Sequence, residues 1–491
     1  MTTVNTTINN YRQRFHLSPP PGFMNDIQSF FHDGRQWHLY YLWNGEHPLP
    51  TGSEWRHVTT KDWTCFRDHG VAIPKYVDGL PSKDVATGSI VRDTDNLAGF
   101  GKGTLLSYNT TFYQGIQRTN LWYSTDGGYH FTPFEGNPIQ ANELQLADFR
   151  DPYVFIHEGK FYLYMAEQYK VGIYESDNGR QFRYVDEVSA DALEHIGDHS
   201  PIECPCLLRA MDVDGKSDQQ KAVLIFGSKK TTHNSIGTYY LIGRMEGPFF
   251  RAETEPKRLD GGPDFYGARA EPRDANNPSR SAYILGWMSS WEYTNQVPAQ
   301  GTWGSMSMCR ELFLSSQNGY TLNSVPIHRN HLFSWRRGYD LDIDANRRQK
   351  FKLWNRRAFA IKLQFNLDDI TEGKCGFTIE GSNWRITWRY NIKTQQFNLK
   401  RTCQDIDQST ITSNGDWKAN FNKEADIDLV PYSDGFDTYV SVNVFVDNTS
   451  IELFTHNDQV CTFSKFGEKG GNTLVLDSTT DMNVICQRRF L

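Results

Sequence analysis

A carboxylate that leads into an aromatic hairpin occurs twice in this sequence, and this repeat constrains the fold more than any other feature. Asp26 is followed by an apolar run that begins at Phe30, and Asp151 is followed at the same spacing by Phe155. In both copies a turn glycine and a second aromatic strand come next. Repeated hairpins are typical of radial all-β architectures, in which equivalent positions converge on an axis. The repeat therefore predicts that carboxylates distant in sequence share one pocket.

Short alternating strands and turns fill residues 15–335, and long amphipathic patterns are absent from this region. Many short strands at near-regular spacing favour an all-β sandwich, barrel or propeller. The region is too long for one sandwich. Four-stranded blades of roughly 50–60 residues would divide it into about five.

The flanking regions differ in composition from this block. We expect the basic, polar stretch 336–350 to be a linker, and the alternating strands of 351–491 suit one β-sandwich. Residues 1–14 are polar and are expected to form a flexible arm. They lack the apolar core of a signal peptide. We therefore expect either a secreted protein whose leader is absent from this chain or a cytoplasmic one.

Composition argues against several classes of partner. A net charge of -7, from 51 basic and 58 acidic residues, gives no reason to expect nucleic acid or an anionic membrane. The sequence has no apolar run of about 18 residues, so no transmembrane helix is predicted. The 8 cysteines are scattered, and Cys204-Pro205-Cys206 lacks the Cys/His cluster of a metal site. Buried free thiols are expected, and the sequence leaves the oligomeric state open.

Three acidic positions can form a glycosidase site. Hydrolysis with retention needs two carboxyl groups about 5–5.5 Å apart, one as nucleophile and one as acid/base. Asp26 and Glu203 are the natural pair, with Asp151 as a third acid. A lone Asp before an apolar run is more often a turn or capping residue. The matched frames of Asp26 and Asp151 favour the functional interpretation.

Residues 15–315 resemble glycoside hydrolase family 32, which contains invertases, inulinases, levanases and fructosyltransferases. Three motifs carry the resemblance, in order: Met24-Asn25-Asp26, Arg150-Asp151-Pro152 and Glu203-Cys204. It implies that Asp26 is the nucleophile, that Asp151 holds fructosyl hydroxyls and stabilises the transition state, and that Glu203 is the acid/base. It also implies a five-bladed β-propeller followed by a β-sandwich, and a double displacement without metal or organic cofactor.

Shorter matches of the same resemblance indicate the substrate pocket. They are Glu54-Trp55-Arg56-His57, Thr87-Gly88-Ser89, Gly262-Pro263-Asp264-Phe265-Tyr266, Gly286-Trp287-Met288 and Cys309-Arg310-Glu311-Leu312. The residues expected to contact substrate are Asn25, Trp43, Asn44, Trp55, Ser89, Arg150 and Asp264. The rings of Trp43 and Trp55 are candidates for stacking on sugar faces, and a place in the blade core is the alternative for both.

Departures from the family pattern concern the substrate. Invertases and inulinases usually read Asn-Asp-Pro-Asn-Gly and Tyr-Gln-Tyr-Asn, whereas this chain has Asn25-Asp26-Ile27-Gln28-Ser29 and Tyr41-Leu42-Trp43-Asn44. This looks more like the branch of endo-levanases and levan fructotransferases. Leu42 either removes a polar clamp and frees O6 of the bound fructose, or it is a core substitution. We expect a preference for β-2,6-linked fructan (levan), with an exo-acting β-fructofuranosidase on sucrose or inulin-type fructan as the alternative.

Other classes of function are less consistent with these motifs. A sugar-binding module without catalysis is disfavoured because all three acids are present. An arabinan- or xylan-type five-bladed enzyme has a similar acid triad, but the Arg-Asp-Pro and Glu-Cys motifs argue against it. Hydrolysis and fructosyl transfer differ only in the acceptor. We also expect Glu203, beside an ionised Asp26, to keep its proton, since a like charge disfavours ionisation.

Overall fold

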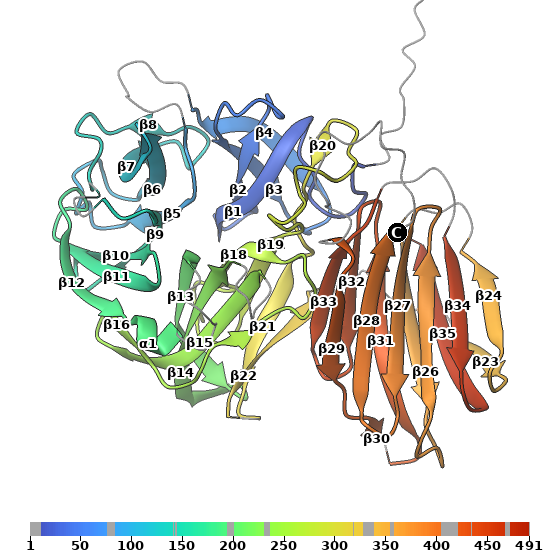
Figure 1. Ribbon diagram of the computed structural model, residues 1–491. Helices are drawn as coiled ribbons and strands as arrows, with labels where there is room; N and C mark the ends of the chain where they lie inside the picture. Colours follow the sequence, from blue (N-terminus) through green and yellow to red (C-terminus); the bar gives the residue numbers. More distant parts are fainter. Residues whose placement is uncertain are drawn as a thin grey trace, which may run out of the picture.

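The chain folds into a β-propeller followed by a β-sandwich, and the two domains lie side by side (Figure 1). This computed structural model describes residues 11–490 apart from 76–83, 141, 143–144, 194–200, 230–235, 318, 328–337, 354–357, 404–420, 434 and 467–471. The helix α1 (Ala190–Leu193) is a single turn after the third blade. In the described ranges, none of the helical segments is long and apolar enough to cross a membrane.

The described strands of the propeller form five antiparallel blades around an axis (Figure 1). The first blade contains β1 (Gly22–His32), β2 (Trp37–Asn44), β3 (Glu54–Thr60) and β4 (Phe66–Ile73). The second contains β5 (Gly88–Asp93), β6 (Thr104–Tyr113), β7 (Ile116–Ser124) and β8 (Thr132–Pro133). The third contains β9 (Phe149–His157), β10 (Lys160–Glu167), β11 (Lys170–Ser176) and β12 (Arg183–Val188).

The last two blades are joined in one sheet by the pairing of β13 with β21. The fourth contains β13 (Ile202–Val213), β14 (Lys216–Ser228), β15 (Gly237–Glu246) and β16 (Phe249–Ala252), with β17 (Lys257–Arg258) beside β15. The fifth contains β18 (Tyr266–Pro272), β19 (Ala282–Trp287), β21 (Arg310–Ser315) and β22 (Thr321–Pro326). After β19, the short strand β20 (Thr302–Trp303) pairs in parallel with β1 and closes the ring.

Four inner strands share one irregularity near their beginning. In β1, β9, β13 and β18 two consecutive residues face a single residue of the next strand, and these pairs are Asn25-Asp26, Asp151-Pro152, Cys204-Pro205 and Gly267-Ala268. Such β-bulges bend a strand, re-aim its side chains and are frequent next to active sites. The repeated unit of the sequence is therefore a bulged inner strand.

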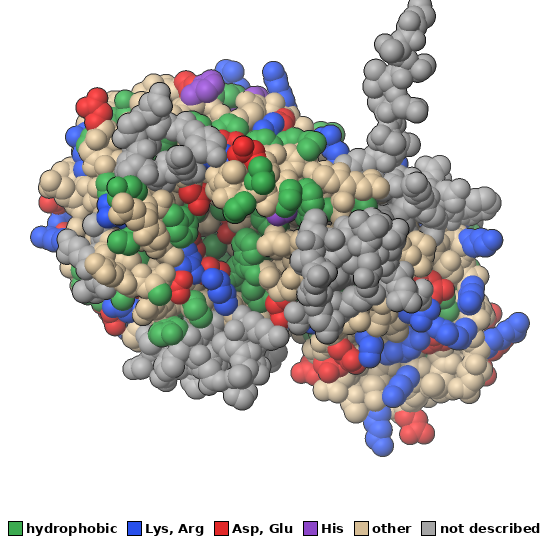
Figure 2. Space-filling model, turned by 45° about the horizontal axis from the view of Figure 1, so that its top comes forward, with side chains coloured by type: hydrophobic (Ala, Val, Ile, Leu, Met, Phe, Trp, Pro, Cys, Tyr) green, Lys and Arg blue, Asp and Glu red, His purple; other side chains and the backbone are tan. Residues whose placement is uncertain are grey.

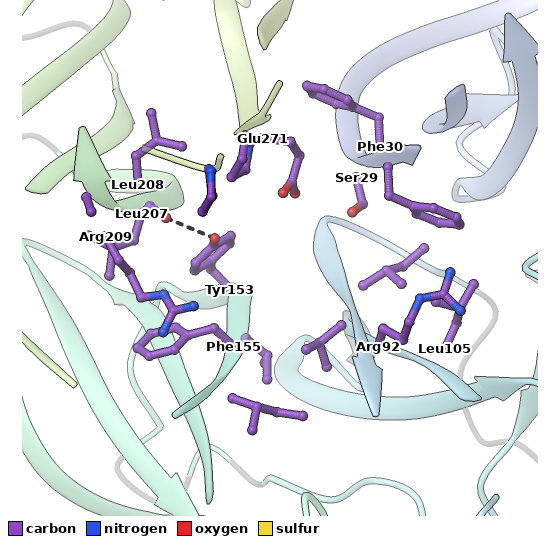
Figure 3. Close-up of a pocket in the computed structure, with 18 residues that line it drawn as sticks. Ser29, Phe30, Arg92, Leu105, Tyr153, Phe155, Leu207, Leu208, Arg209 and Glu271 are labelled. Carbon is purple, nitrogen blue, oxygen red and sulfur yellow. Dashed lines mark hydrogen bonds between the residues drawn. The ribbon is translucent and has the colours of Figure 1, made fainter. Parts of the chain in front are cut away.

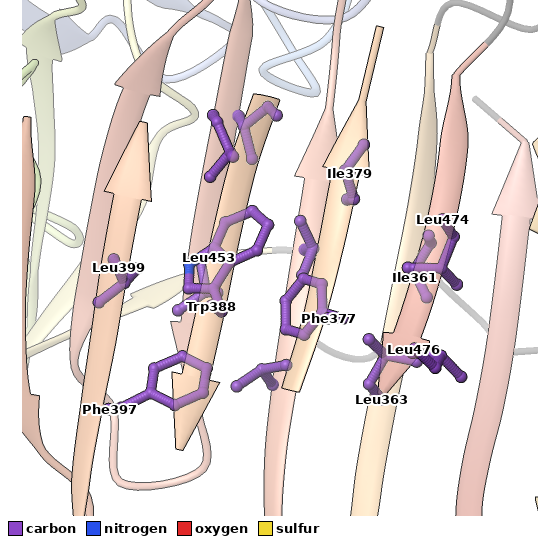
Figure 4. Close-up of a cluster of buried hydrophobic side chains, with 14 of the residues drawn as sticks. Ile361, Leu363, Phe377, Ile379, Trp388, Phe397, Leu399, Leu453, Leu474 and Leu476 are labelled. Carbon is purple, nitrogen blue, oxygen red and sulfur yellow. The ribbon is translucent and has the colours of Figure 1, made fainter. Parts of the chain in front are cut away.

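The second domain consists of two antiparallel sheets packed face to face. One sheet contains β23 (Tyr339–Ile343), β35 (Met482–Phe490), β25 (Phe359–Asn366), β31 (Thr438–Val446), β32 (Ser450–Thr455) and β33 (Val460–Ser464), with β30 (Tyr432–Ser433) beside β31. The other contains β24 (Arg348–Lys352), β34 (Thr473–Ser478), β26 (Lys374–Glu380), β27 (Trp384–Asn391), β28 (Gln396–Cys403) and β29 (Glu424–Asp428). Their alternating apolar side chains meet in one core, where Ile361 and Leu363 face Phe377 and Leu476 (Figure 4). This architecture confirms the expected fold class.

Two expected segment boundaries are wrong. The stretch 336–350 is not a linker where the structure describes it, because β23 pairs with β35 and β24 with β34 inside the sandwich. Gln13 and Arg14 do not belong to a loose arm. The Gln13 amide donates to Ser450 Oγ at 2.8 Å, and the Arg14 backbone N–H donates to Asp447 Oδ1 at 2.8 Å. Residues 1–10 of the expected arm lie outside the described part.

Buried charges hold the two domains together. Arg310 of the propeller is fully buried and pairs with Asp260 at 2.8 Å and with Glu452 of the sandwich. His16 lies between Asp447 and Glu452, at 2.9 and 2.7 Å. Burial alone would lower the pKa of His16, but the two carboxylates raise it to about 9. Removal of one member of this network would leave an uncompensated buried charge, which is strongly destabilising.

Candidate active site

Three bulged inner strands bring Asp26, Asp151 and Glu203 together at the propeller axis. Their exposed fractions are 6%, 3% and 8%. Cys204 Sγ lies 3.8 Å from Asp26 Oδ2 and 3.6 Å from Asp151 Oδ2, and the Cys204 backbone N–H donates to Asp151 at 2.9 Å. The propeller is hollowed where its blades meet, and acidic, basic and apolar side chains show there (Figure 2). The three acids predicted from the sequence therefore share one site, which we call the triad.

The carboxylate of Asp26 has one oriented oxygen and one free oxygen. Thr87 Oγ1 donates to Oδ2 at 3.2 Å. Oδ1 is buried and accepts no hydrogen bond from the described residues. Gln28 fixes the backbone beneath, because its amide donates to the Asp26 carbonyl at 2.7 Å and accepts from the Gly88 N–H at 2.8 Å. A fixed carboxylate with an unbonded oxygen suits a nucleophile.

Glu203 is contacted on both oxygens. Arg150 Nε and Nη2 donate to Oε1 at 3.0 and 2.7 Å, and Lys229 Nζ lies 3.0 Å from the same oxygen. The Tyr266 hydroxyl donates to Oε2. Two cations on one oxygen favour the ionised carboxylate, and the phenol orients the other oxygen. Such a carboxyl can accept and return a proton in a fixed direction.

The pKa values of the triad diverge. Burial, together with the charges of Asp151 and Glu203, raises the pKa of Asp26 to about 7. Burial also raises the pKa of Asp151, although Arg150 opposes it. Burial acts upward on Glu203 too, but Arg150 and Lys229 outweigh it and hold its pKa below the ordinary value. The expectation that Glu203 keeps the proton is therefore wrong in this structure. The two cations outweigh the repulsion between like charges.

The backbone of β18 passes directly beneath the nucleophile candidate. Gly267 has a φ of 53°, and a Cβ built on it would lie 2.1 Å from Asp26 Oδ1. A left-handed φ and this close approach both favour glycine. The fourth bulge therefore carries no acid and instead leaves room for the carboxylate of the first.

The Thr87-Gly88-Ser89 motif contacts the triad through a different residue from the one expected. Ser89 Oγ donates to the Pro152 carbonyl at 2.9 Å and accepts from the Val154 N–H at 3.0 Å. It therefore braces β5 against β9. Thr87 is the residue of this motif that bonds to Asp26.

The motif that contains Asp264 also contacts the triad through a residue other than the expected one. This residue is fully buried in the domain interface, where it pairs with Arg401 and accepts from the Tyr293 hydroxyl. It is therefore a structural anchor and not a substrate contact. Tyr266 of the same motif reaches Glu203.

Trp55 and Leu42 lie in a hydrophobic cluster of the first and second blades. Trp55 is 0% exposed, and its indole N–H donates to the Ala86 carbonyl at 2.9 Å. Neither face of this ring is open to a sugar, so the expected stacking role is wrong. Leu42 is packed in the same cluster and is a core substitution. Ile27 is likewise buried, in the core of the first blade.

The remaining substrate candidates lie near the start of β1 or β9, or at the end of β2. Asn25 belongs to the same bulge as Asp26, and Arg150 contacts the triad. Trp43 is half-buried, with the Arg56 guanidinium carbon 4.6 Å from its ring centroid. Asn44 fixes the turn after β2, since its Oδ1 accepts from the Glu46 N–H at 3.0 Å.

A cavity of about 600 Å³ is lined by later residues of the inner strands, past the bulges that hold the triad. Ser29 and Glu271 point into it from different strands (Figure 3). Arg269 separates it from the triad by donating to the carbonyls of Pro205 and Gly88, both at 2.8 Å. Burial raises the pKa of Glu271 to about 8. Glu271 has no second acid beside it in the lining, so this cavity lacks the carboxyl pair of a glycosidase. Ser29 therefore does not shape the sugar pocket.

Sequence reasoning missed Thr87, Tyr266 and Lys229 as triad contacts. The first two lie within matched motifs, and a motif alone does not say which of its residues faces the axis. Lys229 belongs to no motif. It lies beside Glu203 because β14 runs antiparallel to β13, with Gly227 opposite Glu203. The pairing of adjacent hairpin strands is the signal that would have found it.

The comparisons with known proteins agree with this geometry. Residues 16–326 match the N-terminal domain of glycosyl hydrolases family 32, and residues 337–474 match the C-terminal domain of that family. A levanbiose-producing levanase of Bacillus subtilis (strain 168) is 38% identical over 327 residues, 65% of this chain and 61% of the relative. A levanbiose-producing levanase of Geobacillus stearothermophilus is 38% identical over 312 residues, 62% of this chain and 76% of the relative.

The structural likeness extends over nearly the whole chain. The fructofuranosidase of Schwanniomyces occidentalis complexed with fructose superimposes with a TM-score of 0.81 at 22% identity, over 99% of both chains. An exo-inulinase from Aspergillus awamori gives a TM-score of 0.81 at 22% identity, also over 99% of both chains. These likenesses confirm the fold. With both domains matched in order, the chain belongs to glycosyl hydrolase family 32.

Proposed function

We propose that the protein is a β-fructofuranosidase that cleaves fructans with retention of configuration, and that it prefers β-2,6-linked fructan. The observation that carries this proposal is the pairing of two differently held carboxyls. Asp26 has an unbonded buried oxygen, whereas Glu203 is oriented by Tyr266 and Arg150. One carboxyl is therefore free to attack and the other is positioned to exchange a proton.

The proposed roles follow from these contacts. Asp26 attacks the anomeric carbon while Glu203 protonates the leaving oxygen, which forms a covalent fructosyl-enzyme. Glu203 then takes a proton from water or from a sugar hydroxyl, and this acceptor attacks the anomeric carbon from the face that the leaving group vacated, which breaks the bond to Asp26 and releases its carboxylate. Asp151 accepts hydrogen bonds from fructosyl hydroxyls. Asp26 and Glu203 share one proton in the active form, and the productive arrangement has that proton on Glu203.

The preference for levan is supported by the relatives named levanbiose-producing levanase. Leu42 and Ile27 give no support, because both lie in the core. Exo-action on inulin-type fructan or sucrose is the second candidate. It is favoured by an extracellular exo-inulinase of Meyerozyma guilliermondii that is 28% identical over 323 residues. The word extracellular in that name also supports secretion of this protein.

The test is product analysis on levan, inulin and sucrose. Levan should give the highest kcat/KM, and NMR should show the β-anomer as the first product. Asp26→Ala should fold normally and lose activity by about a thousand-fold or more. Substantial turnover by that variant would contradict the nucleophile assignment, and a preference for sucrose would contradict the levan assignment. Fructosylated sugars among the products would identify transfer.

A further inference from the structure

A groove lies between the second and third blades, beside the triad but separate from it. Its volume is about 550 Å³, within the range of about 300–1,000 Å³ that is typical of ligand pockets. Its aromatic lining consists of Phe149, Tyr174, Phe182 and Tyr184. Polar side chains of the second-blade loop and of the third blade line the rest of it.

The groove is continuous with the backbone that carries the triad. Phe149, on its wall, directly precedes Arg150. Gln168, in the turn after β10, donates its N–H to the Asp148 carbonyl at 3.1 Å and accepts from the Ile202 N–H at 2.7 Å. Ile202 directly precedes the acid/base candidate. A ligand in the groove would therefore lie against the same segments that hold the catalytic groups.

The chemistry of the groove suits an uncharged sugar chain. Tyr184 is 48% exposed, and its ring meets the edge of Tyr174 with centroids 5.5 Å apart at 82°. Lys170 Nζ lies 5.1 Å from the centroid of the Tyr184 ring, so this cation covers part of the ring while the side chain as a whole stays exposed at the groove. Lys170 is neutralised by Glu187 at 2.6 Å, and Glu167 accepts from the Tyr174 hydroxyl. Aromatic rings with paired charges bind the apolar faces and hydroxyls of sugars without requiring ligand charge.

We propose that this groove binds a second stretch of the fructan chain, outside the units that react at the triad. The inference rests on the proposed function, and it adds that long chains are held between the second and third blades. It predicts a lower KM for polymeric levan than for short substrates, because only a long chain reaches both the triad and the groove.

The test compares Tyr184→Ala with Tyr432→Ala. Tyr432 lies in the sandwich and is 49% exposed, so it is a matched control. For Tyr184→Ala, KM on high-mass levan should rise about three- to ten-fold, the loss expected for one aromatic contact. Its kcat on levan and its kcat/KM on sucrose should not change. Tyr184→Phe keeps the ring and should behave like wild type, as should Tyr432→Ala.

A binding measurement separates this proposal from the proposed function. In the background of Asp26→Ala, which cannot turn over, migration through levan-containing gels should be retarded, and Tyr184→Ala should reduce that retardation. An unchanged KM on levan and unchanged retardation in Tyr184→Ala would overturn the groove assignment, as would an equal effect of Tyr432→Ala or of Tyr184→Phe. Failure of the wild type to cleave any fructan would instead overturn the proposed function.

Discussion

Replacement of Gly267 by alanine should disable the site without removing any catalytic group. A Cβ there would lie 2.1 Å from Asp26 Oδ1 and 2.5 Å from its carboxyl carbon. Non-bonded carbons rest about 3.5–4.0 Å apart, so the carboxyl group must shift by about 1 Å. A misplacement of about 1 Å can cost about a hundred-fold in rate. We expect kcat/KM of Gly267→Ala on levan to fall by about that factor.

A matched control separates this clash from backbone strain. Gly267 has a φ of +53° and Gly247 a φ of +60°, but nothing lies within 4 Å of a Cβ at Gly247. Both alanine variants should lose about 1–2 kcal/mol from the left-handed conformation. Urea unfolding and initial rates on levan measure the two effects. A folded Gly267→Ala with wild-type kcat/KM, or equal activity losses in both variants, would refute the reasoning.

Two further predictions concern charge. In wild type, kcat/KM should fall at alkaline pH as the proton shared by Asp26 and Glu203 is lost. The fall should lie near pH 7, because burial and the neighbouring carboxylates raise the pKa of Asp26 to about 7. Lys229→Met removes a cation beside Glu203, which raises the pKa of Glu203, so the pH at which kcat/KM falls should increase. An unchanged pH profile would contradict the role of Lys229. His16→Phe should lower the free energy of unfolding at pH 7 by about 3–5 kcal/mol, since it leaves Asp447 without its buried cation and Glu452 with Arg310 alone. The pKa of His16 is raised from 6.5 to about 9, so the stability that His16 contributes should be complete below pH 6.5 and disappear as pH rises through 9. A difference in unfolding free energy between His16→Phe and wild type that does not change with pH would contradict this.

The acids of the site were predictable because each lies in a short motif at the start of an inner strand. The repeat of Asp26 and Asp151 already indicated convergence on an axis, and the structure places both in bulges of equivalent strands. The strand pattern likewise predicted blades and a sandwich. Alternation of apolar residues depends on local sequence, so it can be read without knowledge of tertiary contacts.

The substrate residues were less predictable because their environment depends on distant chain segments. Asp264 looks like a pocket residue in its motif, yet Arg401 of the sandwich takes its carboxylate into the domain interface. Trp55 is covered by residues of the second blade, including Ala86, which accepts its indole N–H. A bulge also changes which face of a strand a residue occupies, and the alternation of the sequence does not reveal where a bulge begins.

The bulges explain how nearly equivalent strands carry different chemistry. Asp151 and Cys204 adopt left-handed φ values of 62° and 52°, which cost of order 1–3 kcal/mol each for residues other than glycine. Hydrogen bonds hold these conformations, since Thr110 Oγ1 accepts from the Asp151 N–H at 2.8 Å and Asp151 in turn accepts from the Cys204 N–H at 2.9 Å. Gly267 occupies the same bulge position without that cost and leaves room for Asp26. The strain is therefore concentrated where Asp151 and Glu203 must turn toward the axis, and it is absent where the nucleophile needs space.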